Sequence, residues 1–360
     1  MPGEVLTMSA MTETRGSKEA RRAPSMADVA KHAGVSHQTV SRVLNDSSLV
    51  REATRARVHA AIEELGYRRN MAARMLATNR SARIGMISAH LVLYGPSMIS
   101  AAVQDAGHEA GYDVSLVGLS EFSVESLHNA VDRLLDQAVE ALVVAVAQRD
   151  ALAATRDLRL SIPVVVAQGV SAGQPMAAGV DQHAGARDAT DHLLELGHRR
   201  VAHVTGPMDW VEAEQRRAGW RAAQAGRGLL PGPELTGDWS ARSGYEAGLQ
   251  IAEDHDVTAV FVANDAMALG VLKALHQRGR RVPVDVSVIG FDDVPESAYF
   301  WPALTTVNQD FATLGRRAVE LTLRALEGEA DPVSELVPPQ VVVRESTGQD
   351  RKSTRLNSSH

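Results

Sequence analysis

Apolar side chains recur at helical spacing in two short neighbouring segments, residues 26–33 and residues 36–45. Gly34 lies between them, and glycine accepts the positive φ that a tight turn between helices requires. Ser36 opens the second segment with a hydroxyl that caps a helix N-terminus well. The inward positions are Met26, Val29, Ala30 and Ala33, then Val40, Val43 and Leu44. The pattern predicts two short helices joined by a turn.

A third amphipathic stretch, residues 48–66, ends at Gly66, a residue type that favours helix C-termini. Its apolar side is formed by Val50, Thr54, Val58, Ile62 and Leu65. We therefore predict a three-helix head over residues 25–68. Residues 69–82 contain helix formers and a weak apolar face but have no partner in the head, so a helix there is marginal in isolation.

From Ile84 onward, β-branched runs alternate with helical patterns, which is typical of a parallel, doubly wound α/β architecture. The strands are too many for one compact sheet, so we expect two lobes. The predicted strands are residues 84–88, 114–119, 141–146, 164–168, 201–205, 259–263 and 286–291. The predicted helices include residues 97–110, 124–137, 184–196, 213–225, 243–253 and 266–278.

Charge divides the chain into a basic front and an acidic body. Residues 1–83 hold 14 Lys and Arg against 8 Asp and Glu, whereas the remainder holds 23 against 36. A basic head on an acidic body fits a protein whose head alone contacts DNA. The length of 360 residues allows two or three domains, and the lack of cysteine excludes disulfides and thiolate metal sites.

The two ends of the chain, residues 1–24 and 349–360, are polar and without periodicity, and we predict disorder in both. The chain contains neither the apolar segment of a signal peptide nor an uninterrupted apolar run of about 18 residues, the length of a membrane span. We therefore expect a soluble, cytoplasmic protein with no membrane partner.

The outward face of the second helix carries short polar side chains and one arginine, and it lacks acidic residues that would repel phosphate. Such side chains reach base edges and phosphates in a major groove. This face consists of His37, Gln38, Thr39, Ser41 and Arg42. We predict a DNA-binding helix-turn-helix; the alternative is an ordinary helical hairpin.

Three strings in this region, DVA at residues 28–30, AGVS at 33–36 and QTVSRVLN at 38–45, resemble the lactose-repressor family of bacterial transcription factors. The resemblance extends from about Ser25 to Arg344. It implies a hinge helix at 69–82 and a two-lobed core like that of periplasmic binding proteins, with chain crossovers near Val180, Val307 and Pro338. The implied N-terminal lobe comprises residues 83–180 and 308–338, and the C-terminal lobe residues 181–307 and 339–348.

The resemblance also implies the residues that contact DNA. The implied set is Ser36, His37, Gln38, Thr39, Ser41, Arg42 and Asn45 in the head and Asn70, Ala73 and Leu76 in the hinge. Leu76 falls where the family inserts a leucine pair into the minor groove, and such wedges bend the duplex. The alternative is a plain solvated linker. His37 replaces a tyrosine of the family, which leaves the operator sequence open but keeps its palindromic plan.

Polar residues follow two predicted strands, Asn264-Asp265 and Asp292-Asp293. Ligands of open α/β sheets bind beyond the carboxyl ends of strands, and sugar hydroxyls pair with carboxylates and amides. Trp239 could supply an aromatic face for the apolar side of a sugar ring. For Asp265 we expect a helix cap that starts a helix at Ala266.

By resemblance, several positions correspond to the family's effector contacts. The implied set is Leu93, Pro96, Ile99, Gln168, Arg216, Trp239, Asn264, Asp292, Gln309 and Phe311. Two positions depart from the family's lactose-binding pattern, because Gln168 replaces an aspartate and Ala89 replaces a serine. The resemblance thus favours a galactoside but leaves another sugar open.

We predict a repressor that leaves its palindromic operator when a sugar binds between the lobes. Open alternatives are another sugar effector, a ligand that acts as co-repressor, and a transport-type sugar-binding protein. A sugar hydrolase using Asp292 and Asp293 is disfavoured, because neighbours on one strand point to opposite faces. No P-loop or G-x-S-x-G motif is present, so we predict no enzyme and no cofactor.

Two further expectations concern metals and assembly. The histidines form no metal-ligand motif, and we expect surface or capping roles for His183, His192, His198 and His203. No leucine heptad of the kind found in tetrameric family members follows Val341–Arg344, so we predict a homodimer.

Overall fold

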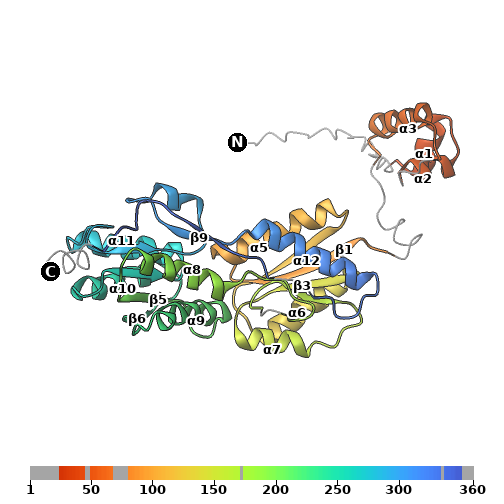
Figure 1. The fold of residues 1–360 in the computed structure, drawn as a ribbon. Coiled ribbons are helices and arrows are strands. Elements are labelled where there is room, and N and C mark those ends of the chain that lie inside the picture. Colours follow the sequence, from red (N-terminus) through yellow and green to blue (C-terminus); the bar gives the residue numbers. More distant parts are fainter. Residues whose placement is uncertain (1–23, 45–48, 68–79, 171–172, 334–335, 351–360) are drawn as a thin grey trace, which may run out of the picture. The chain divides into compact units, whose positions relative to one another are not determined.

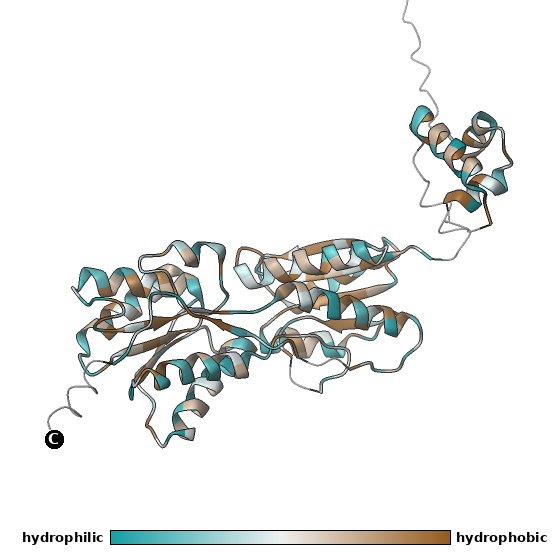
Figure 2. Ribbon diagram, turned by 45° about the horizontal axis from the view of Figure 1, so that its top comes forward, coloured by the Kyte–Doolittle hydropathy of each residue, from teal (hydrophilic) through white to brown (hydrophobic). Residues whose placement is uncertain are grey.

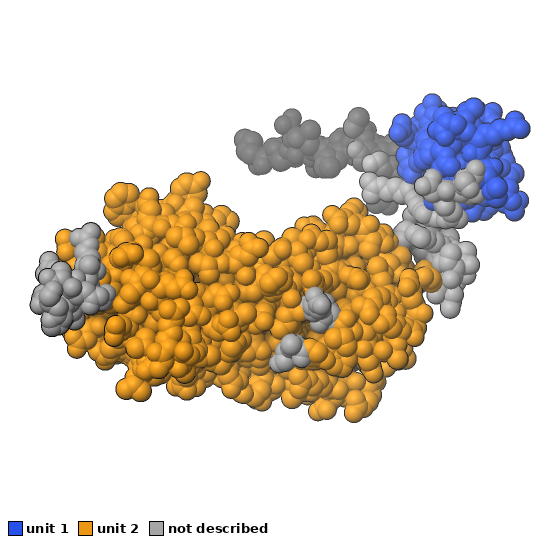
Figure 3. All heavy atoms as spheres, in the orientation of Figure 1, with its two compact units in different colours: residues 1–79 blue, residues 80–360 orange. Residues whose placement is uncertain are grey.

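The computed structural model describes residues 24–44, 49–67, 80–170, 173–333 and 336–350. These belong to two compact units, residues 1–79 and 80–360 (Figure 3). The predicted arm up to residue 23, the hinge up to residue 79 and the tail from residue 351 lie outside the described residues. So do four of the predicted DNA contacts, Asn45, Asn70, Ala73 and Leu76.

The predicted disorder is wrong for the first residues of the tail. The backbone N–H of Asp350 donates to the carbonyl of Leu196 at 2.9 Å. The ordered body therefore extends at least to Asp350.

The head consists of the helices α1 (Met26–Ala33), α2 (His37–Leu44) and α3 (Glu52–Leu65). The Ser25 and Asp28 side chains cap α1 reciprocally, and Gly34 ends it with φ +64°. Both predicted short helices and the turn at Gly34 are confirmed, whereas the third helix starts later than residue 48. The hydrophobic core of the head joins the three helices and consists of Val29, Ala30, Ala33, Val40, Val43, Val58, Ala61 and Tyr67.

Gly34→Val should destabilise the head, because an L-residue at φ +64° costs about 1–2 kcal/mol. Open space surrounds the position of an added Cβ, so the cost comes from the backbone alone. Amide hydrogen exchange in α1 and α2 should accelerate about 5- to 30-fold. Gly34→Asn is the matched control, because asparagine tolerates this conformation better. Equal exchange rates in the valine variant and the unsubstituted protein would contradict the prediction.

The first α/β half of the body contains a parallel sheet of strand order β2-β1-β3-β4 (Figure 1). Its strands are β1 (Arg83–Ala89), β2 (Asp113–Leu119), β3 (Ala141–Ala145) and β4 (Val164–Val166). Its helices are α5 (Tyr94–Glu109), α6 (Val124–Leu135), α7 (Arg149–Asp157) and α12 (Phe311–Leu326). Alternate strand residues point to opposite faces, so Met86 packs with α5 and α12 whereas Ile87 packs with α6.

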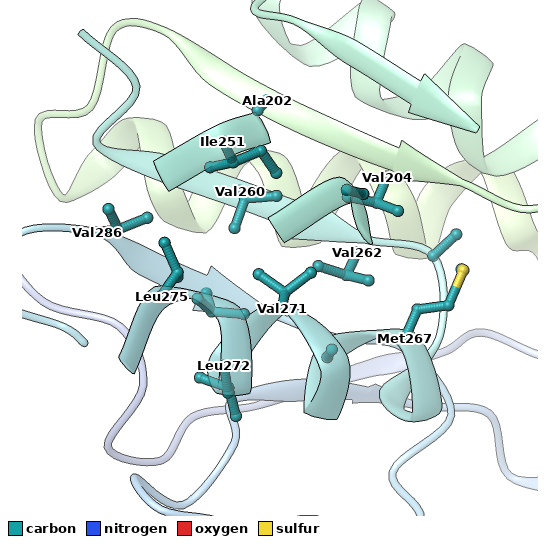
Figure 4. Packing of buried hydrophobic residues seen from close by; sticks show 14 of the residues in the cluster. Ala202, Val204, Ile251, Val260, Val262, Met267, Val271, Leu272, Leu275 and Val286 are labelled. Atoms are coloured by element: carbon teal, nitrogen blue, oxygen red, sulfur yellow. The ribbon is translucent and has the colours of Figure 1, made fainter. Parts of the chain in front are cut away.

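The second half repeats this plan with a parallel sheet of order β6-β5-β7-β8. Its strands are β5 (Val201–Thr205), β6 (Glu234–Thr236), β7 (Ala259–Val262) and β8 (Ser287–Ile289). Its helices are α8 (Gln182–Glu195), α9 (Val211–Gly226), α10 (Ala241–Glu253) and α11 (Asp265–Gln277). Figure 4 shows Val260 and Val262 of β7 packing against Ile251 of α10 and Val271 of α11. α8 and α9 cover the other face of the sheet.

Three segments that join the two halves lie together. Val180 forms a parallel bridge with Val337, and β9 (Thr306–Asn308) pairs antiparallel with β10 (Gln340–Val342). All seven predicted strands are present, and the doubly wound two-lobed architecture is confirmed. The sequence analysis did not predict β6, β9, β10, α7 or α12. The lobe boundaries within residues 83–348 stay predictions.

Figure 2 shows hydrophobic colouring concentrated on the strands and polar colouring on the outer faces of the helices. This distribution is that of a water-exposed α/β body around apolar sheets. Among the helices in the described ranges, none has the length and apolar character required to cross a membrane.

Candidate nucleic-acid interface and ligand cavity

Helix α2 presents a polar face with its apolar side fixed in the head. Val40 and Val43 are buried, whereas His37, Gln38 and Arg42 are exposed. Ser36 and Thr39 serve the helix start, because Ser36 Oγ accepts a hydrogen bond from the Thr39 N–H at 3.1 Å. The side chains of His37, Gln38, Ser41 and Arg42 have no part in this cap, and the DNA contacts predicted for them and for Ser36 and Thr39 stay predictions.

Two adjoining cavities, of about 380 Å³ and 370 Å³, lie at the carboxyl ends of strands of both sheets. The structure places all ten predicted ligand residues around them. The first cavity is lined by Ile99, Gln168, Arg216, Gln309 and Phe311, and the second by Leu93, Pro96, Gln168, Arg216, Trp239, Asn264 and Asp292. Residues from α5, α9, α12 and the ends of several strands thus converge on one site.

Arg216 belongs to a closed ring of four buried polar side chains. Its Nε donates to Gln182 Oε1 at 2.8 Å, and its Nη1 lies 3.8 Å from Asp292 Oδ1. Gln182 donates to Gln309 Oε1 at 2.8 Å, and Gln309 donates to Asp292 Oδ1 at 2.6 Å. The ring holds the guanidinium and the carboxylate in fixed positions beside the cavities.

Burial dominates the electrostatics of this ring. It lowers the pKa of Arg216 and raises the pKa of Asp292 to about 6, although Arg216 and Gln309 favour the carboxylate. The Arg216 guanidinium also lies 3.9 Å from the centre of the Phe291 ring, and it donates to the Ala263 carbonyl. The arginine is therefore held by packing as well as by hydrogen bonds.

Aromatic rings form two parts of the wall. Trp239 contacts Trp210 edge-on, with ring centres 5.5 Å apart, and Phe311 contacts Tyr94 in the same way at 5.9 Å. Trp239 and Phe311 are both largely buried, and each lines one of the cavities. Their rings can therefore pack against a ligand only inside the cavities.

The predicted helix cap at Asp265 is wrong, because its neighbour Asn264 caps α11. Asn264 Oδ1 accepts from the Met267 N–H at 2.8 Å, and its amide donates to the Trp239 carbonyl at 3.1 Å. Asp265 is instead fully buried and accepts from Thr306 Oγ1 at 2.5 Å. Burial and the nearby Asp292 raise the pKa of Asp265 to about 8.

The expectation that Asp292 and Asp293 are neighbours on a strand is also wrong. β8 ends at Ile289, and both aspartates have positive φ in the following loop. Asp292 lines the cavity, whereas Asp293 pairs with Arg344 at 2.6 Å. Because the two carboxylates make separate contacts, they do not form a catalytic dyad. The sequence argument against the dyad, that the two lie on opposite faces of a strand, is a different one.

The prediction of surface or capping roles is wrong for two of the four histidines. His198 is buried and bonds Thr258 at 2.8 Å, and His203 is fully buried against Phe261. Burial lowers the pKa of His203 to about 4. In the part of the chain that the structure describes, no three His, Asp or Glu side chains are grouped to hold a metal ion.

Among the residues around the cavities that the prediction missed are Tyr94, Gln182, Trp210, Glu212 and Gln215. For Glu212 a signal exists, because it precedes Arg216 by four residues and therefore shares its helix face. Gln182 lies two residues after the linking residue Val180, which places it near the connection between the halves.

A helix-turn-helix head joined to a two-lobed α/β body with a polar cavity defines a ligand-responsive DNA-binding regulator. Residues 25–70 match the model of bacterial regulatory proteins of the lacI family, and residues 190–347 match the periplasmic binding protein-like domain. The chain belongs to the lacI family and is a DNA-binding transcriptional repressor, which confirms the predicted resemblance.

Relatives cover nearly the whole chain. The lactose operon repressor of Escherichia coli is 38% identical over 324 residues, 89% of either chain. The regulator CelR of Thermobifida fusca is 35% identical over 91% of this chain and 99% of its own length. A crystal structure of the lac repressor dimer bound to operator and the anti-inducer ONPF matches with a TM-score of 0.78 and 37% identity, covering 91% of this chain and all of that one.

Proposed function

We propose that this repressor holds a palindromic operator as a homodimer and leaves it when a sugar, first of all a galactoside, occupies the cavities. The ring of Arg216, Gln182, Gln309 and Asp292 carries this proposal. Its alternating donors and acceptors suit hydroxyl groups, and Trp239 offers a face for the apolar side of a sugar ring. Gln168, a neutral amide beside this ring, bears on which hydroxyls are held.

The same proposal assigns the exposed face of α2 to the major groove. Two heads related by a two-fold axis would read two half-sites, and Leu76 of the hinge would wedge the centre of the operator. Sugar binding favours a body geometry in which the heads no longer grip both half-sites together. The sugar acts only through its different affinity for the two geometries.

A surface for the second copy is available beside α11 and the short helix η1 (Pro295–Tyr299). Leu269 is 44% exposed, Tyr299 88% and Trp301 91%. Trp301 also lines a surface hollow of about 740 Å³ with Leu272 and His276 of α11. Large apolar side chains gathered at a surface are typical of an interface. We assign this α11–η1 surface to the dimer.

An electrophoretic mobility shift on the DNA upstream of the protein's own coding sequence tests the function. We expect a specific complex that lactose or another galactoside dissolves, whereas ribose leaves it intact. Release by cellobiose alone would replace the galactoside with another sugar. A complex that sugars strengthen would make the ligand a co-repressor. No complex with any duplex at low salt would overturn the function.

A further inference from the structure

Glu212 is a buried carboxyl group with one oxygen unused. It lies on α9, and only 5% of its surface is exposed. Its Oε1 accepts a hydrogen bond from the Gly169 N–H at 2.9 Å. Its Oε2 makes no hydrogen bond with any described residue. A buried carboxylate oxygen without a partner is costly, so a site that keeps one is prepared for a donor.

The position of Glu212 links this oxygen to the ligand. Glu212, Gln168 and Arg216 line both cavities, so Glu212 lies where the two cavities adjoin. Trp239 Nε1, a buried donor on the wall of the second cavity, also has no hydrogen bond within the described part of the chain. The site therefore lacks one donor and one acceptor.

These two requirements select the chemistry of the ligand. A hydroxyl group donates and accepts, so a polyol satisfies both Glu212 and Trp239. An ammonium group satisfies only the carboxylate, and an anionic group satisfies only the indole N–H while it repels Glu212. The unpaired groups thus favour a neutral polyhydroxylated ligand over a charged one.

We propose that Glu212 is a specificity-determining ligand residue, whose Oε2 accepts a hydrogen bond from an effector hydroxyl while Oε1 stays on Gly169. This inference rests on the proposed sugar effector. The acidic acceptor then comes from α9, on the second sheet, and not from the position of Gln168 after β4. A ligand hydroxyl bound to Glu212 therefore touches the α9 residue that already holds the backbone of the first half at Gly169.

The protonation state of Glu212 provides a second test of this role, through the pH dependence of sugar affinity. Burial raises the pKa of Glu212 to about 7; the charge of Arg216, the Gly169 N–H and the nearby Gln168 amide all favour the carboxylate. The other titratable side chains that line the second cavity are Tyr94 and Asp292. Because the carboxylate accepts more strongly than the acid, sugar affinity should rise between pH 6 and pH 8.

Isothermal titration of lactose and of cellobiose into the full chain tests this role. At pH 8, Glu212→Gln should lower the affinity for whichever of the two sugars the unsubstituted protein binds by about tenfold, because a charged acceptor becomes a neutral amide. It should also remove the part of the rise that lies between pH 7 and pH 8, where Asp292, with a pKa of about 6, is already largely ionised, while operator binding without sugar stays unchanged. The matched control is Glu246→Gln, an exposed glutamate on α10, which should bind the sugar within twofold of the unsubstituted protein.

The outcomes separate this inference from the function beneath it. If sugar releases the unsubstituted protein from its operator and Glu212→Gln binds that sugar equally well, only the role of Glu212 is overturned. A rise in sugar affinity between pH 7 and pH 8 that survives undiminished in Glu212→Gln would likewise overturn it, because Asp292 is already largely ionised in that range. If the unsubstituted protein binds operator but neither sugar, the sugar effector fails and the role of Glu212 fails with it.

Discussion

Arg216→Ala should leave operator binding intact and abolish release by sugar. The substitution removes a buried guanidinium with fixed donors, and charge-assisted hydrogen bonds of this kind contribute about 3 kcal/mol together, more than 100-fold in sugar affinity. The head shares no residue with the cavities, so its contact with DNA is unaffected. Operator shifts titrated with the releasing sugar, together with calorimetry, measure both effects.

Two further variants distinguish a loss of sugar binding from a loss of stability. Arg216→Ala leaves the Asp292 carboxylate without its cation, and breaking a buried pair costs about 3–5 kcal/mol of stability. Arg216→Lys keeps the charge but not the planar fork, so it should fold well and still lose tenfold or more in sugar affinity. Arg221→Ala removes a half-exposed arginine of α9 that pairs with Glu234, and it should respond normally. Full sugar release in Arg216→Lys would remove the arginine from the binding site.

Trp301→Glu should convert the dimer into monomers and weaken operator binding at least about 100-fold. The indole is almost wholly exposed on the α11–η1 surface, and a charge there cannot be buried against a second copy without a large penalty. A monomer grips one half-site only and loses the gain in affinity that comes from linking two heads. Sedimentation velocity measures the assembly, and mobility shifts on the palindromic operator measure the binding.

Leu230→Glu is the matched control for this prediction. Leu230 is 86% exposed and precedes β6, which lies at the opposite edge of the second sheet from β8. The control should remain a dimer with unchanged operator affinity. A Trp301→Glu protein that still sediments as a dimer would place the interface elsewhere.

The fold could be predicted where the pattern is local and long enough. The head follows from helical spacing around Gly34, and the strands β1, β3 and β7 follow from continuous apolar runs. The strands β6, β9 and β10 have three residues each, and unlike the equally short β4 and β8 they do not lie within a longer, largely apolar run of the sequence. α12 does contain helical spacing, with Phe311, Leu314 and Ala318 on its buried side, so its sequence holds a usable signal.

The site could be predicted only in part, because its contacts join distant parts of the chain. Gln182 and Gln309 bond directly although 127 residues separate them, and neither sequence neighbourhood marks the pair. Resemblance supplied the positions of Arg216 and Asp292, but it could not supply Glu212, whose importance comes from an unpaired oxygen visible only in three dimensions. The cap at Asn264 shows the same limit. Asn264 and Asp265 are adjacent polar residues, and only the structure shows that Asn264 is the one that caps α11.

The two glutamines of the polar ring have a mechanical consequence. Gln182 lies two residues after the linking residue Val180, and Gln309 directly follows β9, another of the three connections between the halves. We expect these connections to act as hinges when the two halves change their relative position. A sugar that replaces one hydrogen bond of the ring therefore acts directly on a residue next to a hinge. Sugar binding can then rotate one half against the other without transmitting the change through either sheet.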